Sequence, residues 1–323
     1  MLWGEGSSGV FGGSLESGCW LGCGGVGWGM SFRLKMLQVA RVAPKVLGEA
    51  SGLVAGFLRS QQDACGGFVD REGKPDLYYS VFGMEGLMAL RESVDEERME
   101  AWLKTFGDGG GLDFVHVCCL ARCWSSLGLK GLSGEVKAGI MARVEGYRSA
   151  DGGYHQAMGR EAGSAYGCLI GWSAYEDLGE RCPEQERLLD CLMSLRTEDG
   201  GWSNERGLPI GVTPAAAAAV SLCRHLGVPV ETKVRDWILA QCLPEGGFKA
   251  LPGIPIPDLL STAVALHALD AMEADLGPLK EACLDFVDSL WNAEGGFHGN
   301  WTDDELDCEY TFYGLLALGH LGL

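Results

Sequence analysis

The sequence has little positive charge for its size. Its 323 residues contain 25 lysines and arginines against 44 aspartates and glutamates, a net charge of −19. So acidic a surface repels nucleic acid and anionic membranes, so neither is expected as a partner. The sequence also lacks a run of 18 apolar residues, and this predicts no transmembrane helix. Together these features favour a soluble protein, and we expect a cytoplasmic one.

Signs of secretion and of a disulfide framework are also missing. The 13 cysteines are odd in number and lie mostly within apolar helical patterns, so we expect buried, reduced thiols. Residues 1–30 are rich in glycine and serine, without the basic and apolar regions of a secretory signal. We predict a disordered leader at 1–30, a helical segment at 31–50 and a repeat domain at 51–323.

A repeated unit accounts for most of the chain. Six glycine pairs, each followed by an aromatic residue or leucine, recur at intervals of 42 to 49 residues. A regular period of this length indicates a single repeat architecture rather than several domains. The pairs begin at Gly66, Gly110, Gly152, Gly200, Gly246 and Gly295.

Each repeat contains two predicted helices of different character. The first is amphipathic, whereas the second is apolar nearly all round, as in Thr213–Cys223, where Thr213 is a suitable N-cap and Pro214 suits the first turn. A helix without a polar face must be covered on all sides. We therefore predict an all-α fold, an α/α toroid of six helical hairpins with the apolar helices inside, and an open solenoid as the alternative. The predicted outer helices are 53–61, 97–106, 134–147, 184–196, 232–241 and 279–291.

The loops carry further expectations. The glycine pairs should end the outer helices in left-handed geometry, with Gly296 as an example, and the aromatic after each pair should plug the end of the barrel. Acidic residues that open inner helices are expected to act as N-caps. These acidic residues are Asp76, Asp113, Asp258 and Asp307.

Three motifs resemble the β subunits of protein prenyltransferases, with the Rab geranylgeranyltransferase β subunit most similar in layout. They are Asp151–Gly163, Asp258–Leu269 and Asp307–Leu315. Squalene and hopene cyclases share a related repeat. The resemblance covers roughly residues 50–323. It implies an apolar central funnel for an isoprenoid, prenyl transfer from an isoprenoid diphosphate to cysteine thiols, and a separate helical α-like subunit as partner.

The resemblance also implies a catalytic zinc ion. Asp258 matches the family's aspartate ligand, which makes it the metal and catalytic candidate here. Leu260 stands where the family has cysteine. Tyr310 stands where the family has histidine, and this position makes it a further catalytic candidate. Zinc catalysis uses three protein ligands and an open position, so the standard zinc triad is largely missing.

Substrate contacts are also expected at particular residues. Lys249 and Arg160 are the candidates for the diphosphate, and Tyr154 and Tyr166 for the wall of the funnel. Asp307 is a candidate catalytic acid, because the sequence from Asp307 to Thr311 loosely resembles the acidic motif of class II terpene cyclases, with Glu309 as the second acid and Tyr310 in place of the third.

A second arrangement contains residue types that bind metals. His116, Cys119 and Cys123 share one helix face, with Asp113 one turn before them. Either they bind a metal, or they are buried thiols beside a hydrogen-bonded histidine.

Three functions remain open from the sequence. The first is a prenyltransferase β-like enzyme, the second a non-catalytic toroid that binds an isoprenoid or a protein, and the third a class II terpene cyclase-like enzyme.

Overall fold

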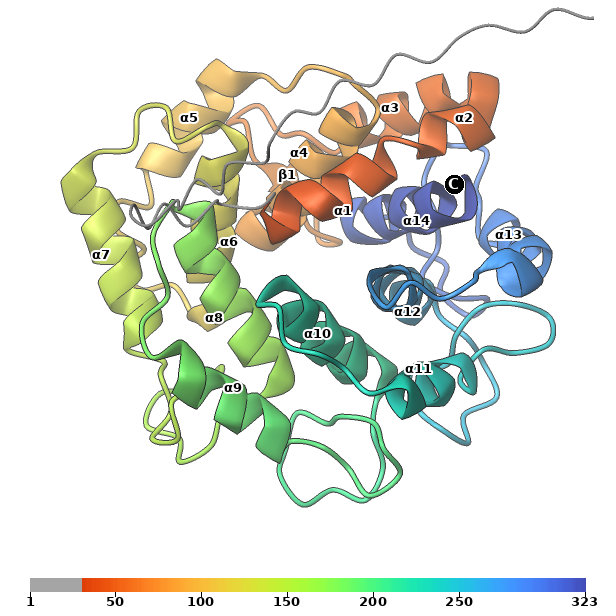
Figure 1. Ribbon diagram of the computed structural model, residues 1–323. Helices are drawn as coiled ribbons and strands as arrows, with labels where there is room; N and C mark the ends of the chain where they lie inside the picture. The colour runs from red at the N-terminus through yellow and green to blue at the C-terminus, as the bar shows by residue number, and fades with distance from the viewer. Residues whose placement is uncertain (1–30) are drawn as a thin grey trace, which may run out of the picture.

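The computed structural model describes residues 31–323, and the predicted leader at 1–30 lies outside them. Figure 1 shows helices arranged as two concentric rings around a central axis. The inner ring consists of α4 (Leu77–Ala89), α6 (Phe114–Ser126), α8 (Ala165–Asp177), α10 (Thr213–His225), α12 (Leu259–Ala271) and α14 (Cys308–Leu321). The outer ring consists of α3 (Ser51–Ser60), α5 (Glu96–Lys104), α7 (Gly134–Glu145), α9 (Gln185–Ser194), α11 (Thr232–Leu239) and α13 (Lys280–Ser289).

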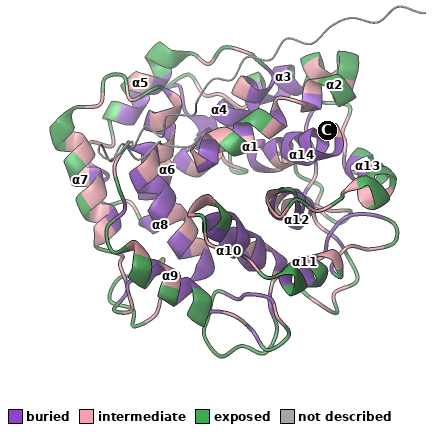
Figure 2. Ribbon diagram, viewed as in Figure 1, coloured by how far each residue is buried: buried purple, intermediate pink, exposed green. Residues whose placement is uncertain are grey.

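The inner ring is closed. Each inner helix packs against the next one, and α14 packs against α4, the first of the ring. The prediction of an α/α toroid is therefore confirmed, and the open solenoid is excluded. Figure 2 shows that the inner helices consist almost entirely of buried and intermediate residues, whereas the outer helices keep an exposed face.

Side-chain caps fix where most inner helices begin. Asp76, Asp113, Asp258 and Asp307 each accept a hydrogen bond from a backbone N–H in the first turn of the following helix, as expected. Thr213 is an exception. It is the first residue of α10, and its hydroxyl donates to the carbonyl oxygen of Lys249 at 2.6 Å instead of capping the helix.

The aromatic residues after the glycine pairs lie between the two rings and not at the end of the barrel, so the prediction of a plug was wrong. Phe68, Tyr154 and Phe297 are fully buried. A Cβ atom on the inner-helix residue Gly83 would meet the Phe68 ring at 2.1 Å, and one on Gly314 would meet the Phe297 ring at 2.9 Å. The aromatic ring needs this space, so the inner helix approaches the outer one only because these positions are glycine.

The glycine pairs turn the chain in the loop beyond each outer helix. In the last repeat the left-handed residue is Gly295, with φ of 101°, whereas Gly296 has no positive φ. A Cβ on Gly295 would also lie 2.2 Å from the carbonyl oxygen of Leu53. The left-handed conformation predicted for Gly296 is therefore found at Gly295 instead.

One end of the toroid is covered by α1 (Phe32–Ala40), which contacts α4, α8 and α14. The backbone N–H of Phe32 donates to Glu176 at the C-terminal end of α8, at 2.8 Å. The short α2 (Ala43–Leu47) and the 3₁₀ turn η1 (Gly48–Ala50) lead into the first repeat. Because α1 lies where the inner helices end, the opposite opening is formed by their N-termini.

Two short elements complete the fold. Strands β1 (Phe68–Val69) and β2 (Pro75–Asp76) pair antiparallel before α4, and the 3₁₀ turn η2 (Gly277–Leu279) precedes α13. Among residues 31–323, no helix combines the length and the apolar character needed to cross a membrane.

Candidate functional site

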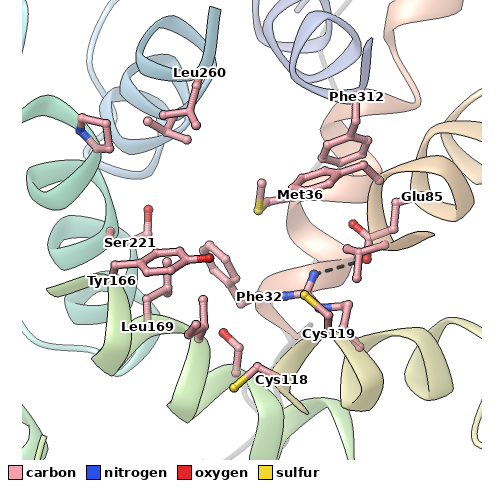
Figure 3. Close-up of a pocket in the computed structure, with 18 of the residues that line it drawn as sticks. Phe32, Met36, Glu85, Cys118, Cys119, Tyr166, Leu169, Ser221, Leu260 and Phe312 are labelled. Carbon is pink, nitrogen blue, oxygen red and sulfur yellow. Dashed lines mark hydrogen bonds and ion pairs between the residues drawn. The ribbon is translucent and has the colours of Figure 1, made fainter. Parts of the chain in front are cut away.

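A central cavity of about 430 Å³ runs along the axis of the inner ring. Its wall is mainly apolar, and Figure 3 shows Tyr166, Leu169, Leu260 and Phe312 around it, with Phe32 and Met36 contributed by α1. The volume lies within the usual range for small-molecule sites. Aromatic and aliphatic side chains of this kind suit a hydrocarbon ligand.

Corresponding residues of the six inner helices lie at the same height in the cavity wall. The second residue of each helix lies at the N-terminal opening, and we call these six residues the mouth ring. They are Tyr78, Val115, Tyr166, Pro214, Leu260 and Glu309. All except Glu309 line the cavity directly. The sixth position of an otherwise uncharged ring is thus a carboxylic acid.

Glu309 is buried, and its carboxyl group is hydrogen-bonded to a neutral side chain of the mouth ring. The phenol of Tyr78 donates a hydrogen bond to Glu309 Oε1 at 2.5 Å. Burial raises the pKa of Glu309 to about 7, and the hydrogen bond from Tyr78 opposes this only in part. Within residues 31–323, no ion pair reaches this carboxyl group. Its acid form is therefore well populated near neutral pH.

Asp307, predicted as a catalytic acid, is occupied by structural contacts. Its Oδ1 accepts the backbone N–H of Tyr310 at 2.8 Å, and its Oδ2 accepts Nε of Arg71 at 2.7 Å. Arg71 also pairs with Asp303 at 2.9 Å. Burial raises the pKa of Asp307, but these donors oppose the shift. The Arg71 contacts tie the β1–β2 loop of the first repeat to the loop of the last.

A second group of charges lies on the neighbouring part of the rim. His116 Nε2 lies 3.0 Å from Asp76 Oδ2, and His116 Nδ1 lies 2.8 Å from Asp113 Oδ1. Hydrogen bonds to these carboxylates raise the pKa of His116 to about 9, so the imidazole is protonated at neutral pH. The pair of carboxylates leaves neither ring nitrogen free for another ligand.

The residues at the predicted zinc site do not fit zinc. Asp258 and Tyr310 do come together at the rim, but Leu260 offers only a hydrocarbon side chain to the cavity. Burial raises the pKa of the Tyr310 phenol to about 12, so it is a poor anionic ligand. Asp258 accepts the backbone N–H of Ser261 at 2.7 Å as the cap of α12. Across residues 31–323, no group of three or more His, Cys, Asp or Glu side chains is arranged so that it could hold a metal ion.

The helix face with His116, Cys119 and Cys123 is likewise not assembled as a metal site. The Cys123 thiol faces the carbonyl oxygen of Leu77 at 3.8 Å, whereas Cys119 lines the cavity. Burial raises the pKa of both thiols, so they are not thiolates. This matches the interpretation of buried thiols beside a hydrogen-bonded histidine.

The four predicted substrate contacts lie in different places. Tyr166 belongs to the mouth ring and lines the cavity. Tyr154 is fully buried outside the cavity, where its phenol lies 3.1 Å from Glu145. Arg160 is exposed in the loop before α8, and Lys249 is half-buried beside the start of α10. Neither cation lines the cavity, so the structure does not gather a basic cluster there.

The closed end of the cavity is polar. The ninth residue of each inner helix lies there, and we call these six residues the floor ring: Glu85, Arg122, Ser173, Ser221, His267 and Leu316. Arg122 pairs with Glu85 at 3.2 Å and with Asp177 at 2.7 Å. Arg33 of α1 lies 3.9 Å from Glu85. The first five residues of the ring line the cavity.

Sequence reasoning did not select the residues that matter most here. Glu309 was noted only as part of an acidic motif, and the floor ring was not proposed as a site. The sequence could have indicated these residues through the numbering of the inner helices. When residues are counted from the start of each inner helix, the six second residues lie at one height along the toroid axis and the six ninth residues at another, because the six helices occupy equivalent places in the ring.

Comparisons with known proteins agree with this architecture. The sequence matches the prenyltransferase alpha-alpha toroid domain over residues 34–106 and 215–321, more than half of the chain. No curated protein sequence matches it.

Solved structures show the same fold at low sequence identity. Candida albicans protein geranylgeranyltransferase-I complexed with GGPP superposes with a TM-score of 0.62 at 12% identity, covering 84% of this chain and 90% of that one. Type II terpene cyclase MstE from Scytonema, in complex with geranylgeranyl dihydroxybenzoate, gives 0.56 at 13%, covering 90% and 97%. An α-1,6-mannanase from Salegentibacter gives 0.54 at 13%, covering 84% and 98%. Since enzymes of unlike activity share the fold, the fold alone does not select the function.

The closed double ring, its apolar axial cavity and the sequence match over more than half of the chain lead to one conclusion: the chain belongs to the prenyltransferase alpha-alpha toroid domain family.

Proposed function

We propose that this protein binds a linear isoprenoid in the central cavity and cyclises it by proton transfer from Glu309, as a class II terpene cyclase-like enzyme. The observation that carries the proposal is the mouth ring. Glu309 is its only carboxylic acid, is held by Tyr78 at 2.5 Å, and has a pKa raised by burial to about 7. General acids work best when their pKa lies near the working pH.

The chemistry follows from this placement. The protonated carboxyl of Glu309 gives its proton to a terminal alkene carbon, or to an epoxide oxygen, at the mouth. The tertiary cation that forms accepts the π electrons of the next alkene, and a ring closes. A neighbouring carbon then loses a proton to water, and Glu309 takes up a proton from water again. The product is therefore an isomer of the substrate. The aromatic rings of Tyr78, Phe82 and Tyr166 line the path and can stabilise positive charge.

Prenyl transfer from a diphosphate is less well supported. Asp76, Asp113, Asp258, Asp303 and Asp307 lie at the rim, and the cations Arg71 and His116 are both engaged by these acids. A diphosphate would therefore meet repulsion rather than a basic cluster. The zinc ion and the α-like subunit belong to that alternative, and the donor set at Asp258, Leu260 and Tyr310 does not favour it.

The proposal is tested with geranylgeraniol and its terminal epoxide as probes, by mass spectrometry of the products. Wild-type protein should give cyclic isomers, and Glu309→Gln should lower their rate by at least about 100-fold. Glu305→Gln is the matched control, since Glu305 is exposed in the loop that leads into α14. It should retain activity.

Two outcomes would overturn the proposal. Tight binding of both probes without any cyclic product from wild-type protein would identify a binding toroid. Zinc-dependent transfer of a geranylgeranyl group from its diphosphate to a cysteine peptide would restore the prenyltransferase.

A further inference from the structure

The floor ring is unusual for the end of a hydrocarbon cavity, because five of its six residues are polar. The wall between the mouth ring and the floor ring is formed mainly by apolar side chains such as Leu169, Val264 and Phe312. Polar groups that are buried at the end of an apolar cavity need partners, since each unpaired group costs free energy.

The charges of the floor already balance one another. Arg122 and Arg33 are cations, and Glu85 and Asp177 are anions in contact with them. All four side chains are at least largely buried, with exposed fractions from 2% to 15%. A charged ligand group would upset this balance, and an anion would lie beside two carboxylates. The floor therefore favours a neutral ligand group.

Two serine hydroxyls supply the unfilled hydrogen-bonding capacity. Ser173 is 5% exposed and Ser221 is 6% exposed, and both line the cavity. The Oγ atom of Ser173 is buried without any partner in the described part of the chain. A hydroxyl both donates and accepts, so a ligand hydroxyl between these two serines would satisfy them.

His267 adds a neutral ring to the same level. Its Nδ1 lies 3.1 Å from His320 Nε2, and its ring lines the cavity. Burial lowers the pKa of His267 to about 4, so the ring is uncharged at neutral pH. With one nitrogen engaged by His320, the other is available to a ligand hydroxyl.

We propose that the floor ring binds a hydroxyl group at the end of the isoprenoid opposite to the end at Glu309. This inference rests on the proposed function and names its substrate class, linear polyprenyl alcohols. The second and ninth residues of a helix are separated by about 10 Å along its axis, so the substrate folds between an acid and a hydroxyl binding site about that far apart. The floor thereby fixes which end of the chain reaches the acid.

The test compares binding of two probes to the whole protein: geranylgeraniol and the C20 hydrocarbon that lacks its hydroxyl group. Dissociation constants can be followed by quenching of tryptophan fluorescence. Wild-type protein should prefer the alcohol by about tenfold, since two buried hydrogen bonds are gained. The double variant Ser173→Ala with Ser221→Ala should lose this preference while it still binds the hydrocarbon. Ser60→Ala, on outer helix α3, is the matched control and should keep the preference.

The outcomes separate this inference from the function on which it rests. Equal affinity of wild-type protein for both probes would overturn the floor as a hydroxyl site and leave the isoprenoid cavity intact. An unchanged preference in the double variant would overturn it as well. Failure of both probes to bind would overturn the proposed function, and the floor assignment with it.

Discussion

Buried carboxylic acids lie at both ends of the cavity, but their surroundings differ. At the floor, Glu85 and Asp177 contact the guanidinium of Arg122 at 3.2 Å and 2.7 Å. At the mouth, the one hydrogen-bond partner of the Glu309 side chain among residues 31–323 is the neutral phenol of Tyr78. The same chemical group is thus fixed as a structural ion at one end and kept as a proton donor at the other. The difference lies in the counter-charge, not in the degree of burial.

The largest expected effect comes from removing the counter-charge at the floor. Arg122→Met should lower the free energy of unfolding by about 3–5 kcal/mol, because buried Asp177 loses its cationic partner and buried Glu85 keeps only the longer contact with Arg33. Chemical denaturation measures this. Arg98→Met is the control, since Arg98 is 63% exposed and pairs with Asp95 at the surface. It should cost less than about 1 kcal/mol. An equal loss in the free energy of unfolding for the two substitutions would show that the floor carboxylates do not depend on Arg122 as a counter-charge, and the contrast with Glu309 would fail.

A smaller effect should appear in the pH dependence of stability. The folded-state pKa of Glu309 is raised to about 7 from an ordinary value of 4.5, so the folded protein holds this proton more tightly. Its contribution to stability is therefore complete at low pH and falls as pH rises from about 4.5 to about 7. Wild-type protein should lose about 3 kcal/mol more than Glu309→Gln across this window.

Denaturation at a series of pH values tests this prediction. His116, whose pKa is raised to about 9, adds a separate loss of stability as pH rises through about 9. That loss is common to both proteins and cancels in their difference. Identical pH profiles below pH 7 for the two proteins would show that Glu309 is ionised when folded.

The smallest effect concerns the neutral partner at the mouth. Tyr78→Phe removes the hydrogen bond donated to Glu309 Oε1, which holds the carboxyl pKa down. The midpoint of the Glu309 transition, and of the acid-dependent activity, should therefore move upward by about one pH unit. Tyr313→Phe is the control, since Tyr313 lines the same cavity from α14. A downward shift for Tyr78→Phe would contradict the assigned role of this phenol.

Most of the fold was predictable because its signals are local. The glycine pairs mark a period, and the absence of a polar face on segments such as Thr213–Cys223 separates inner from outer helices. The caps at Asp258 and Asp307 depend on only a few neighbouring residues. The errors also have local reasons. The conformations of Gly295 and Gly296 depend on the approach of Leu53, which belongs to the other end of the chain.

The site was less predictable, because its contacts join distant repeats. Tyr78 and Glu309 are 231 residues apart and meet only because the ring closes. Arg122 finds Asp177 across neighbouring inner helices, and Arg33 arrives from α1. No pattern within one repeat reveals these partners. The resemblance to prenyltransferases directed attention to Asp258, whereas the register of the six caps points to Glu309.

Closure of the ring also bears on how the chain is made. A ribosome produces α4 long before α14, its neighbour in the finished ring. Until α14 is synthesised, the apolar surface of α4 that packs against it stays uncovered. Nascent chains with such exposed apolar surfaces are prone to aggregate. The ring can therefore close only after α14 has been synthesised. We expect slow synthesis to favour the binding of chaperones to the uncovered surface of α4.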